Sequence, residues 1–174
     1  MRIDINPGDP SWEAAEKLLE IVWPPDVMET IVWRDVVWAH ADRRVMVHAD
    51  APPYDLLCHV GLFVRNALWN DRAVTIGGIG GVATHPDKRG SGLATAAMRT
   101  AMECYAREHR DFAVLFCEPF NFAFYRSLGW HQFEGEVFAE QPQGRIRFDL
   151  MATFVYDLKL APRGGAIDLR GLPW

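Results

Sequence analysis

The spacing of apolar residues predicts a chain in which helices and strands alternate. Over residues 10–23, apolar side chains recur every three or four positions, the period of an amphipathic helix, and Pro24-Pro25 ends the pattern. A second, shorter helix is expected over residues 27–38, against the low helix propensity of its β-branched and aromatic pairs. The most regular apolar stripe predicts a long helix over residues 91–109.

Runs of β-branched and aromatic residues predict the strands. They are expected over residues 43–49, 56–69, 72–84, 112–117, 130–138 and 145–158. Turns are expected at residues 50–55 and at Asn70-Asp71, a bulge near Gly61, and a short helix over residues 120–128 that Gly129 ends. The tail from residue 161 onward has turn residues without periodicity.

The order of these elements predicts the fold class. Residues 112–117 are apolar throughout, as in a strand covered on both faces, and the long helix separates them from residues 72–84. The two strands are therefore expected to lie in parallel, joined by a right-handed crossover. We predict an α/β fold with a mixed twisted sheet and helices on both faces.

Composition and charge narrow the class of protein. Hydrophobic residues make up 49% of 174 positions and no run of 18 apolar residues occurs, so one soluble domain over residues 1–174 is expected, without a membrane span. The N-terminus has no secretory pattern, which predicts a cytoplasmic location. The net charge of -5 disfavours nucleic acid and suits a cationic or neutral small molecule. Cys58, Cys104 and Cys117 lack metal-like spacing and are expected to be reduced structural thiols, with no metal.

Two glycine clusters within residues 77–94 could each receive a phosphate. Residues 78–83 fit the dinucleotide pattern G-x-G-x-x-G/A, but that pattern needs a helix immediately after it, and Pro86 prevents one. Residues 89–94, RGSGLA, lead directly into the predicted long helix instead. Free amides and the positive end of the helix dipole would meet an anion there. We therefore expect a pyrophosphate on this loop, although it lacks the Gly-Lys-Ser/Thr ending of a Walker loop.

The glycine loop and a later segment together resemble a known family. Arg89-x-x-Gly92-x-Ala94, preceded by VATHPDKR and followed after a helix and a strand by FYRSLGW (residues 124–130), resembles the GCN5-related N-acetyltransferase (GNAT) superfamily. Its R/Q-x-x-G-x-G/A loop binds the pyrophosphate of acetyl-CoA. Within that superfamily, HVGLFVR (residues 59–65) and the DLR tail that leads to Trp174 are similar to the aminoglycoside 2'-N-acetyltransferases and to nodulation acyltransferase A.

The resemblance implies a GNAT fold with acetyl-CoA as co-substrate. In this fold two central parallel strands splay apart, and the pantetheine arm lies between them like an extra strand. A backbone N–H near Val82 would then polarise the thioester oxygen. Dimers are common in the family, so a homodimer is among the expected states. The residues implied in acetyl-CoA binding are Val82, Ala83, Thr84, Arg89, Gly90, Ser91, Gly92, Leu93 and Ala94.

The resemblance also implies a general acid. Tyr125 stands where the family carries a tyrosine, on the helix after the second splayed strand, and is predicted to protonate the departing thiolate. The structural alternative is a core aromatic residue on a short helix rich in Phe.

The general base is less well defined. The aminoglycoside acetyltransferases have a Glu on the strand before the loop, where this chain has Gly77, Gly78, Gly80 and Gly81. We interpret these glycines as a bare strand beside the thioester. The remaining candidates, each with a structural alternative, are Glu118, His85, His59 and a water molecule.

These residues predict an N-acetyltransferase that transfers acetyl from acetyl-CoA to a primary amine of a small molecule by direct attack on the thioester. The alternatives are a longer acyl group, a protein or charged-tRNA acceptor, and a catalytically silent acyl-CoA sensor. Because glycine stands where the family usually has the Glu, the alternative of a catalytically silent sensor stays open. Trp174 could offer an aromatic contact to an ammonium group.

Overall fold

The computed structural model describes residues 1–50 and 56–174, so the turn predicted at residues 50–55 lies almost wholly outside the described residues. In chain order the elements are β1 (Arg2–Pro7), η1 (Asp9–Ser11), α1 (Trp12–Val22), α2 (Pro25–Met28), β2 (Arg43–His48), β3 (Leu56–Trp69), β4 (Arg72–Thr84), η2 (Pro86–Lys88), α3 (Leu93–Arg107), β5 (Phe112–Cys117), η3 (Pro119–Asn121), α4 (Phe122–Ser127), β6 (His131–Gln132), β7 (Glu134–Gln141), β8 (Gly144–Arg147), β9 (Ala152–Asp157) and β10 (Gly164–Asp168).

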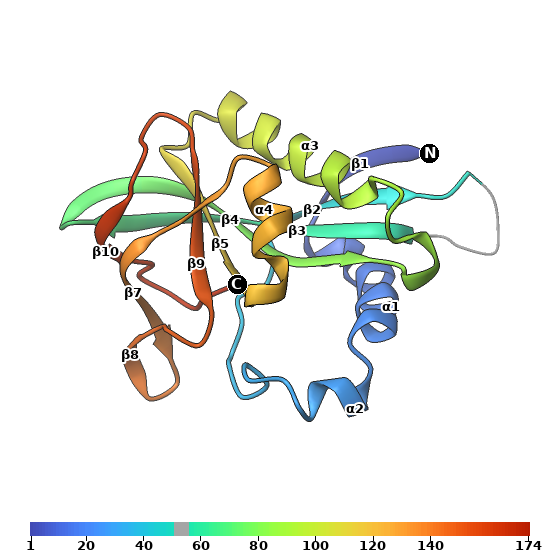
Figure 1. Cartoon of the computed structure of the whole chain (residues 1–174), viewed down its shortest axis with the longest axis horizontal. Coiled ribbons are helices and arrows are strands. Elements are labelled where there is room, and N and C mark those ends of the chain that lie inside the picture. Colours follow the sequence, from blue (N-terminus) through green and yellow to red (C-terminus); the bar gives the residue numbers. More distant parts are fainter. Residues whose placement is uncertain (51–55) are drawn as a thin grey trace.

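The strands of the described residues form one mixed sheet. Hydrogen bonding follows the order β6-β9-β5-β4-β3-β10-β7-β8, with β2 also joined to β3 and β1 to β2. β4 pairs with β5, and β7 with β10, in parallel. β6 and β7 lie far apart in this order, yet only Phe133 separates them in sequence, so the sheet curls to bring its two branches together. Figure 1 shows these C-terminal strands wrapping at one end of the molecule. The predicted mixed α/β sheet is confirmed.

Helices cover both faces of the sheet. α3 packs on the face to which Val45 of β2 points, whereas Leu18 of α1 packs on Met46, the next residue of β2. Neighbouring residues of a strand point to opposite faces, so α1 and α3 lie on opposite faces of the sheet. In Figure 1, α3 runs along the upper side of the strands, and α1 and α2 lie below them.

β4 and β5 are paired over only part of their length. The parallel pairing runs from Ile76 to Ile79 on β4 and from Phe112 to Leu115 on β5, and no further pair joins the two strands in the described chain. Beyond this point β4 remains paired with β3 and carries a bulge, because Gly81 and Val82 together oppose Val60. The bulge predicted near Gly61 therefore exists, but the extra residue is on β4. The two strands diverge at their carboxyl ends.

Several predicted elements differ from the structure. The helix expected over residues 27–38 is only Pro25–Met28, and the β-branched and aromatic residues after it lie in turns or in segments without regular structure. The strands expected over residues 130–138 and 145–158 are each divided in two.

Two strands at the ends of the chain were not predicted. β1 forms by pairing with β2, and β10 forms by pairing with β3 and β7. β10 is Gly-Gly-Ala-Ile-Asp, and of its side chains only that of Ile167 is buried, so it has no alternating pattern of its own.

Candidate active site

The loop before α3 has the geometry of an anion site. Gly90 and Gly92 have φ angles of 76° and 81°, a conformation that favours glycine, and a β-carbon at either position would meet nothing within 4 Å. In the described part of the chain, no group accepts a hydrogen bond from the amides of residues 90–95. The amides of residues 93–95 belong to the first turn of α3, a helix of 15 residues. A pyrophosphate could therefore approach both the amides and the dipole of α3.

The other residues of this loop differ in exposure. Arg89 and Ser91 are exposed, and the Ser91 hydroxyl donates to the Lys88 carbonyl. Leu93 is buried in the core and fixes the first turn of α3, so only its backbone can face a ligand. Ala94 is partly exposed on that turn.

The splayed end of β4 contains the three residues predicted to bind pantetheine. Val82 is part of the bulge, and Ala83 and Thr84 after it pair with His59 and Cys58 of β3. The β3 edge of this segment is therefore occupied, while the edge toward β5 has no strand on it in the described chain. An extended ligand with amide groups could pair with that edge.

A buried histidine holds the bulge in place. The His59 side chain is 1% exposed, its Nδ1 donates to the Gly81 carbonyl at 2.7 Å, and its Nε2 accepts from Arg44 at 3.1 Å. Burial is the main cause that lowers the pKa of His59 to about 4, opposed by the bond to Gly81 and assisted by the Arg44 charge. The Nε2 lone pair already has a donor, so the geometry gives His59 a structural role and leaves it poorly placed as a base.

His85 lies just after β4, in a turn. Its Nδ1 accepts from the Asp87 amide at 3.3 Å and lies 3.9 Å from the Asp87 carboxylate. The structural alternative for His85 is an exposed turn residue; it does lie in the turn into η2, which it caps, but its side chain is only 13% exposed.

The interpretation of the glycines on β4 as a bare strand is wrong at Gly77 and Gly78. A β-carbon at Gly77 would overlap the ring of Tyr105 from α3, and one at Gly78 would overlap the ring of Trp174. The Tyr105 hydroxyl also donates to the Gly78 carbonyl at 2.6 Å. The protein's own rings fill the space beside Gly77 and Gly78 on both faces, which leaves no room for a carboxylate side chain at either position.

The Trp174 ring belongs to this packing. It is 5% exposed, stacks on Phe63 with ring centroids 5.7 Å apart, and donates from Nε1 to the Val114 carbonyl at 3.2 Å. The ring is a core residue, so its predicted contact with an ammonium group is not supported.

Tyr125 lies on the α4 side of the splay. Its side chain is 6% exposed, and the thiols of Cys117 on β5 and Cys58 on β3 are close enough to affect its ionisation. Burial is the main cause that raises its pKa above the ordinary value of 10.0, so the phenol keeps its proton at neutral pH. Gly129, with a φ of 89°, ends the helix that carries it. A protonated phenol at the splay can donate a proton.

Glu118 lies on the opposite side of β5 from Tyr125. Cys117 packs with Tyr125 in the core under α3 and α4, whereas Phe116 packs in the second core cluster on the other face. Strand residues alternate, so Glu118, directly after β5, continues the Phe116 side. There it lines a cavity of about 410 Å³ together with Val32 and Phe148.

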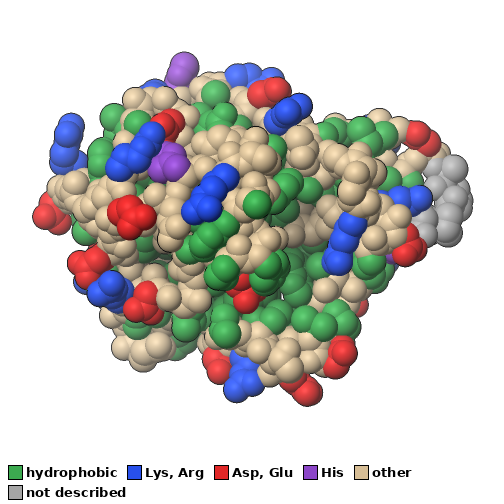
Figure 2. Space-filling view, in the orientation of Figure 1, with side chains coloured by type: hydrophobic (Ala, Val, Ile, Leu, Met, Phe, Trp, Pro, Cys, Tyr) green, Lys and Arg blue, Asp and Glu red, His purple; other side chains and the backbone are tan. Residues whose placement is uncertain are grey.

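Sequence reasoning missed a row of aromatic rings that leads to this cavity. We define the aromatic row by successive ring contacts whose centroids lie 4.8 to 6.1 Å apart. Its members are Trp23, Trp33, Trp38, Phe148, Phe116, Trp174 and Phe63. Alternation along residues 112–118 could have shown that Phe116 and Glu118 share a face, but the row joins segments distant in sequence. Figure 2 shows hydrophobic side chains gathered around a hollow between the surfaces over α4 and α2.

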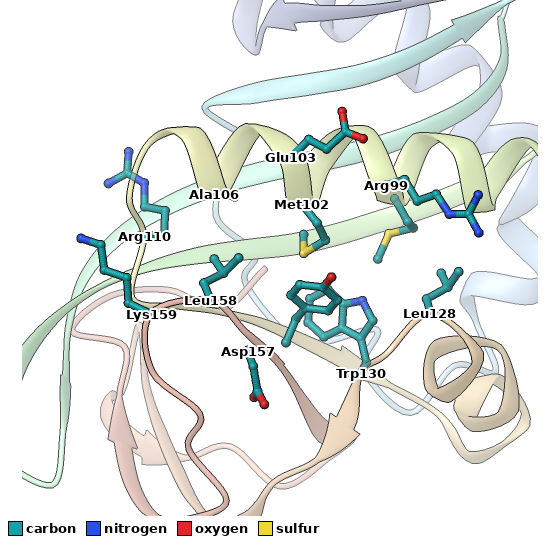
Figure 3. A pocket seen from close by; sticks show the side chains of 12 residues that line it. Arg99, Met102, Glu103, Ala106, Arg110, Leu128, Trp130, Asp157, Leu158 and Lys159 are labelled. Carbon is teal, nitrogen blue, oxygen red and sulfur yellow. The ribbon is translucent and has the colours of Figure 1, made fainter.

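A larger cavity, of about 550 Å³, lies elsewhere, between α3 and the end of β9 (Figure 3). Met102 of α3 faces Trp130 across it, and the Trp130 Nε1 atom has no hydrogen-bond partner in the described residues. None of the predicted site residues lines it.

Among the described helices, none combines the length and apolar character needed to cross a bilayer.

Comparison with known proteins identifies relatives. The sequence profile of the acetyltransferase (GNAT) domain matches residues 11–133. An aminoglycoside 2'-N-acetyltransferase of Mycolicibacterium fortuitum is 34% identical over 139 residues, which cover 77% of this chain and 68% of that protein.

Solved structures support the same fold. A GNAT family N-acetyltransferase from Escherichia coli in complex with CoA has a TM-score of 0.66 at 14% identity, over 97% of this chain and 89% of that one. The Escherichia coli protein ElaA has a TM-score of 0.61 at 14% identity, over 90% and 99% of the two chains. The predicted GNAT fold, a mixed twisted sheet with splayed central strands and helices on both faces, is confirmed.

Proposed function

The chain belongs to the GNAT acetyltransferase family, and from that premise we propose that it transfers the acetyl group of acetyl-CoA to a primary amine of a small molecule, by direct attack of the amine on the thioester. Residues 1–174 act as one catalytic domain in this proposal. The Mycolicibacterium fortuitum relative is by name an enzyme that acts on aminoglycosides, which are small-molecule amines.

The observation that carries the proposal is the position of Tyr125 and Glu118 on opposite sides of the splay. Tyr125 packs with Cys117 under α4, and Glu118 lines the cavity on the other face. A thioester between the diverging strands would have a phenol near its sulfur and a carboxylate near the incoming amine. Acyl transfer needs these two functions, removal of a proton from the amine and donation of a proton to the leaving thiolate.

The residues predicted to bind acetyl-CoA would make two types of contact with it. The amides of residues 90–95 and the exposed Arg89 would hold the pyrophosphate. The free edge of residues 82–84 would pair with the pantetheine amides, and the bulge that His59 fixes would direct a backbone N–H toward the thioester oxygen. Acetyl-CoA supplies the activated acyl group, and the residues of the chain orient it and move the protons.

Direct attack is favoured over an acetyl-cysteine intermediate. Cys117 is the thiol at the end of β5, and burial raises its pKa to about 12. A thiol is a poor nucleophile until it is deprotonated, so Cys117 is a weak candidate for covalent catalysis at neutral pH.

The experiment that tests the proposal compares two variants in a thiol-release assay with acetyl-CoA and a primary amine. Tyr125→Phe should lower kcat by about 100-fold and Glu118→Gln should lower kcat/KM by a similar factor, the range typical of lost proton transfer. The Kd for acetyl-CoA should change by less than about twofold in both, since neither side chain is needed to bind the pyrophosphate.

Matched controls are Tyr156→Phe, whose ring lines the other cavity, and Glu20→Gln, on an exposed face of α1. Both should keep normal turnover. Unchanged kcat in Tyr125→Phe would refute its role as acid. Acetyl-CoA binding without transfer to any amine would favour a silent sensor instead.

A further inference from the structure

We infer that the amine acceptor carries its primary amine on an apolar aromatic scaffold, as in an arylalkylamine, and that the 410 Å³ cavity beside Glu118 selects it. This inference rests on the proposed function and names the class of substrate for the same site. Three features of the described cavity support it: the chemistry of its lining, its connection to the aromatic row, and its exposed apolar rim.

Most of the residues that line the cavity are apolar, among them Val32, Phe122, Phe133, Phe148, Leu150 and Met151, while Gln132 and Thr153 add uncharged polar groups. Its charged members are Glu118, Arg147 and Asp149. Arg147 lies 3.1 Å from Glu136 and 3.9 Å from Asp149, so its single charge is shared between two carboxylates. Glu118, directly after β5, has no ion pair among the described residues and can receive an ammonium group.

The aromatic row connects the cavity with the core beside the splay, where the rings of Phe148 and Trp174 are themselves buried. Phe148 lines the cavity and contacts Phe116 with ring centroids 4.8 Å apart, and Phe116 contacts Trp174 at 5.9 Å. On its other side, Phe148 contacts Trp38 at 5.9 Å in an edge-to-face arrangement. A substrate ring could add to these contacts with the same edge-to-face or stacked geometry.

Two large apolar side chains are exposed at the rim of the cavity. Val32 is 61% exposed and Leu150 is 47% exposed, from segments more than a hundred residues apart in sequence. A bound apolar scaffold would remove both from water, a change that favours binding in proportion to the area covered. A hydrophilic scaffold would gain nothing from either side chain.

The same lining disfavours an aminoglycoside. Such a substrate brings several ammonium groups and many hydroxyl groups, each of which needs a partner when it leaves water. Apart from Asp149, which lies beside Arg147, the described cavity offers Glu118 as its acidic side chain, with mostly apolar neighbours, and the rings beside Gly77 and Gly78 leave no room for a further acid at those two positions. The inferred acceptor therefore differs from that of the relative named above.

The first test measures kcat/KM for 2-phenylethylamine, tryptamine, ethylamine and kanamycin with acetyl-CoA. Ethylamine is the matched control because it lacks only the ring. We expect 2-phenylethylamine to exceed ethylamine by about 100-fold, since burial of a ring contributes this order of discrimination. Equal values for the two amines, or a preference for kanamycin, would overturn the inference and leave the proposed acetyl transfer standing.

The second test replaces apolar side chains at the rim with uncharged polar ones, since an added carboxylate would itself attract the ammonium group. Val32→Asn and Leu150→Asn should each raise the KM for 2-phenylethylamine by about tenfold while the Kd for acetyl-CoA stays within about twofold. Ile21→Asn is the control, because Ile21 is similarly exposed, at 50%, on α1 and does not line the cavity. An unchanged KM in both rim variants would contradict the assignment of this cavity to the acceptor.

Calorimetric measurement of 2-phenylethylamine binding distinguishes failure of the cavity assignment from failure of the proposed acetyl transfer. Binding that the rim variants weaken, without acetylation of any amine, would support the cavity and overturn the proposed function. Acetylation of kanamycin without binding of 2-phenylethylamine would support the proposed acetyl transfer and overturn the assignment of the cavity.

Discussion

The buried histidine at the bulge predicts a specific dependence of stability on pH. His59 has an ordinary pKa of 6.5 in the unfolded chain, and burial lowers its pKa to about 4 in the folded protein. The folded state therefore binds a proton less readily than the unfolded state. The stability that this difference represents is complete above about pH 6.5 and is lost as the pH falls toward 4.

The magnitude follows from the pKa difference. Each unit corresponds to about 1.4 kcal/mol, so the full loss below pH 4 is about 3 kcal/mol, and the part lost between pH 7 and pH 5 is about 2 kcal/mol. Such a loss is a large fraction of the stability of an ordinary domain.

Urea unfolding at pH 7 and pH 5 measures this effect, with His59→Gln as the comparison. A Gln amide can still donate to the Gly81 carbonyl and accept from Arg44, but it does not titrate. The free energy of unfolding of the original protein should fall by about 2 kcal/mol more than that of the variant between the two pH values. All other histidines are common to both proteins, so their contributions cancel.

An equal fall in both proteins would refute the reasoning. An NMR titration of the His59 ring in the original protein provides a second measurement that does not depend on the folding of the variant. It should give a pKa of about 4, and a value near 6.5 would contradict the role of burial and of the Arg44 contact.

The remaining predictions concern the glycine strand and the cofactor loop. Gly78→Ala should destabilise the protein by about 1–3 kcal/mol in thermal unfolding, because its methyl group would overlap Trp174. Adding Trp174→Leu should restore part of this loss. A single variant as stable as the original protein would show that the ring can move. Ser91→Asp should raise the Kd for acetyl-CoA about tenfold, because its carboxylate would repel the pyrophosphate, whereas the uncharged Ser91→Asn should not; equal Kd values would place the pyrophosphate elsewhere.

The sequence was informative wherever the signal was local. The glycine loop and α3 were predicted from six adjacent residues and one apolar stripe, and Gly129 was expected to end α4, as it does. These features depend on backbone conformation and helix periodicity, which neighbouring residues determine.

The prediction failed where contacts join distant segments. β10 exists only because β3 and β7 flank it, and nothing in Gly-Gly-Ala-Ile-Asp indicates a strand. The glycines of β4 suggested exposed backbone, but Gly77 and Gly78 make room for the rings of Tyr105 and Trp174, which lie far away in the sequence. For the same reason the aromatic row could not be predicted from the positions of its tryptophans.

The side of β5 on which Glu118 lies could be predicted only in part from the sequence. The alternation of residues 112–118 would have put it with Phe116 and away from Cys117, but only the structure shows that the cavity lies on that side, with Phe122 of α4 in its wall, while Tyr125 of the same helix packs in the core with Cys117. The proposed division of acid and base between Tyr125 and Glu118 thus depends on the fold as well as on the strand.

The central claim is that the splayed strands support transfer of acetyl from acetyl-CoA to an amine. The most direct measurement is the product balance: mass spectrometry counts acetylated amine while a thiol reagent counts free CoA in the same reaction. The account predicts one acetylated amine for each thiol released, with both signals reduced together in Tyr125→Phe. Release of thiol without acetylated amine, or no release while acetyl-CoA binds, would contradict it.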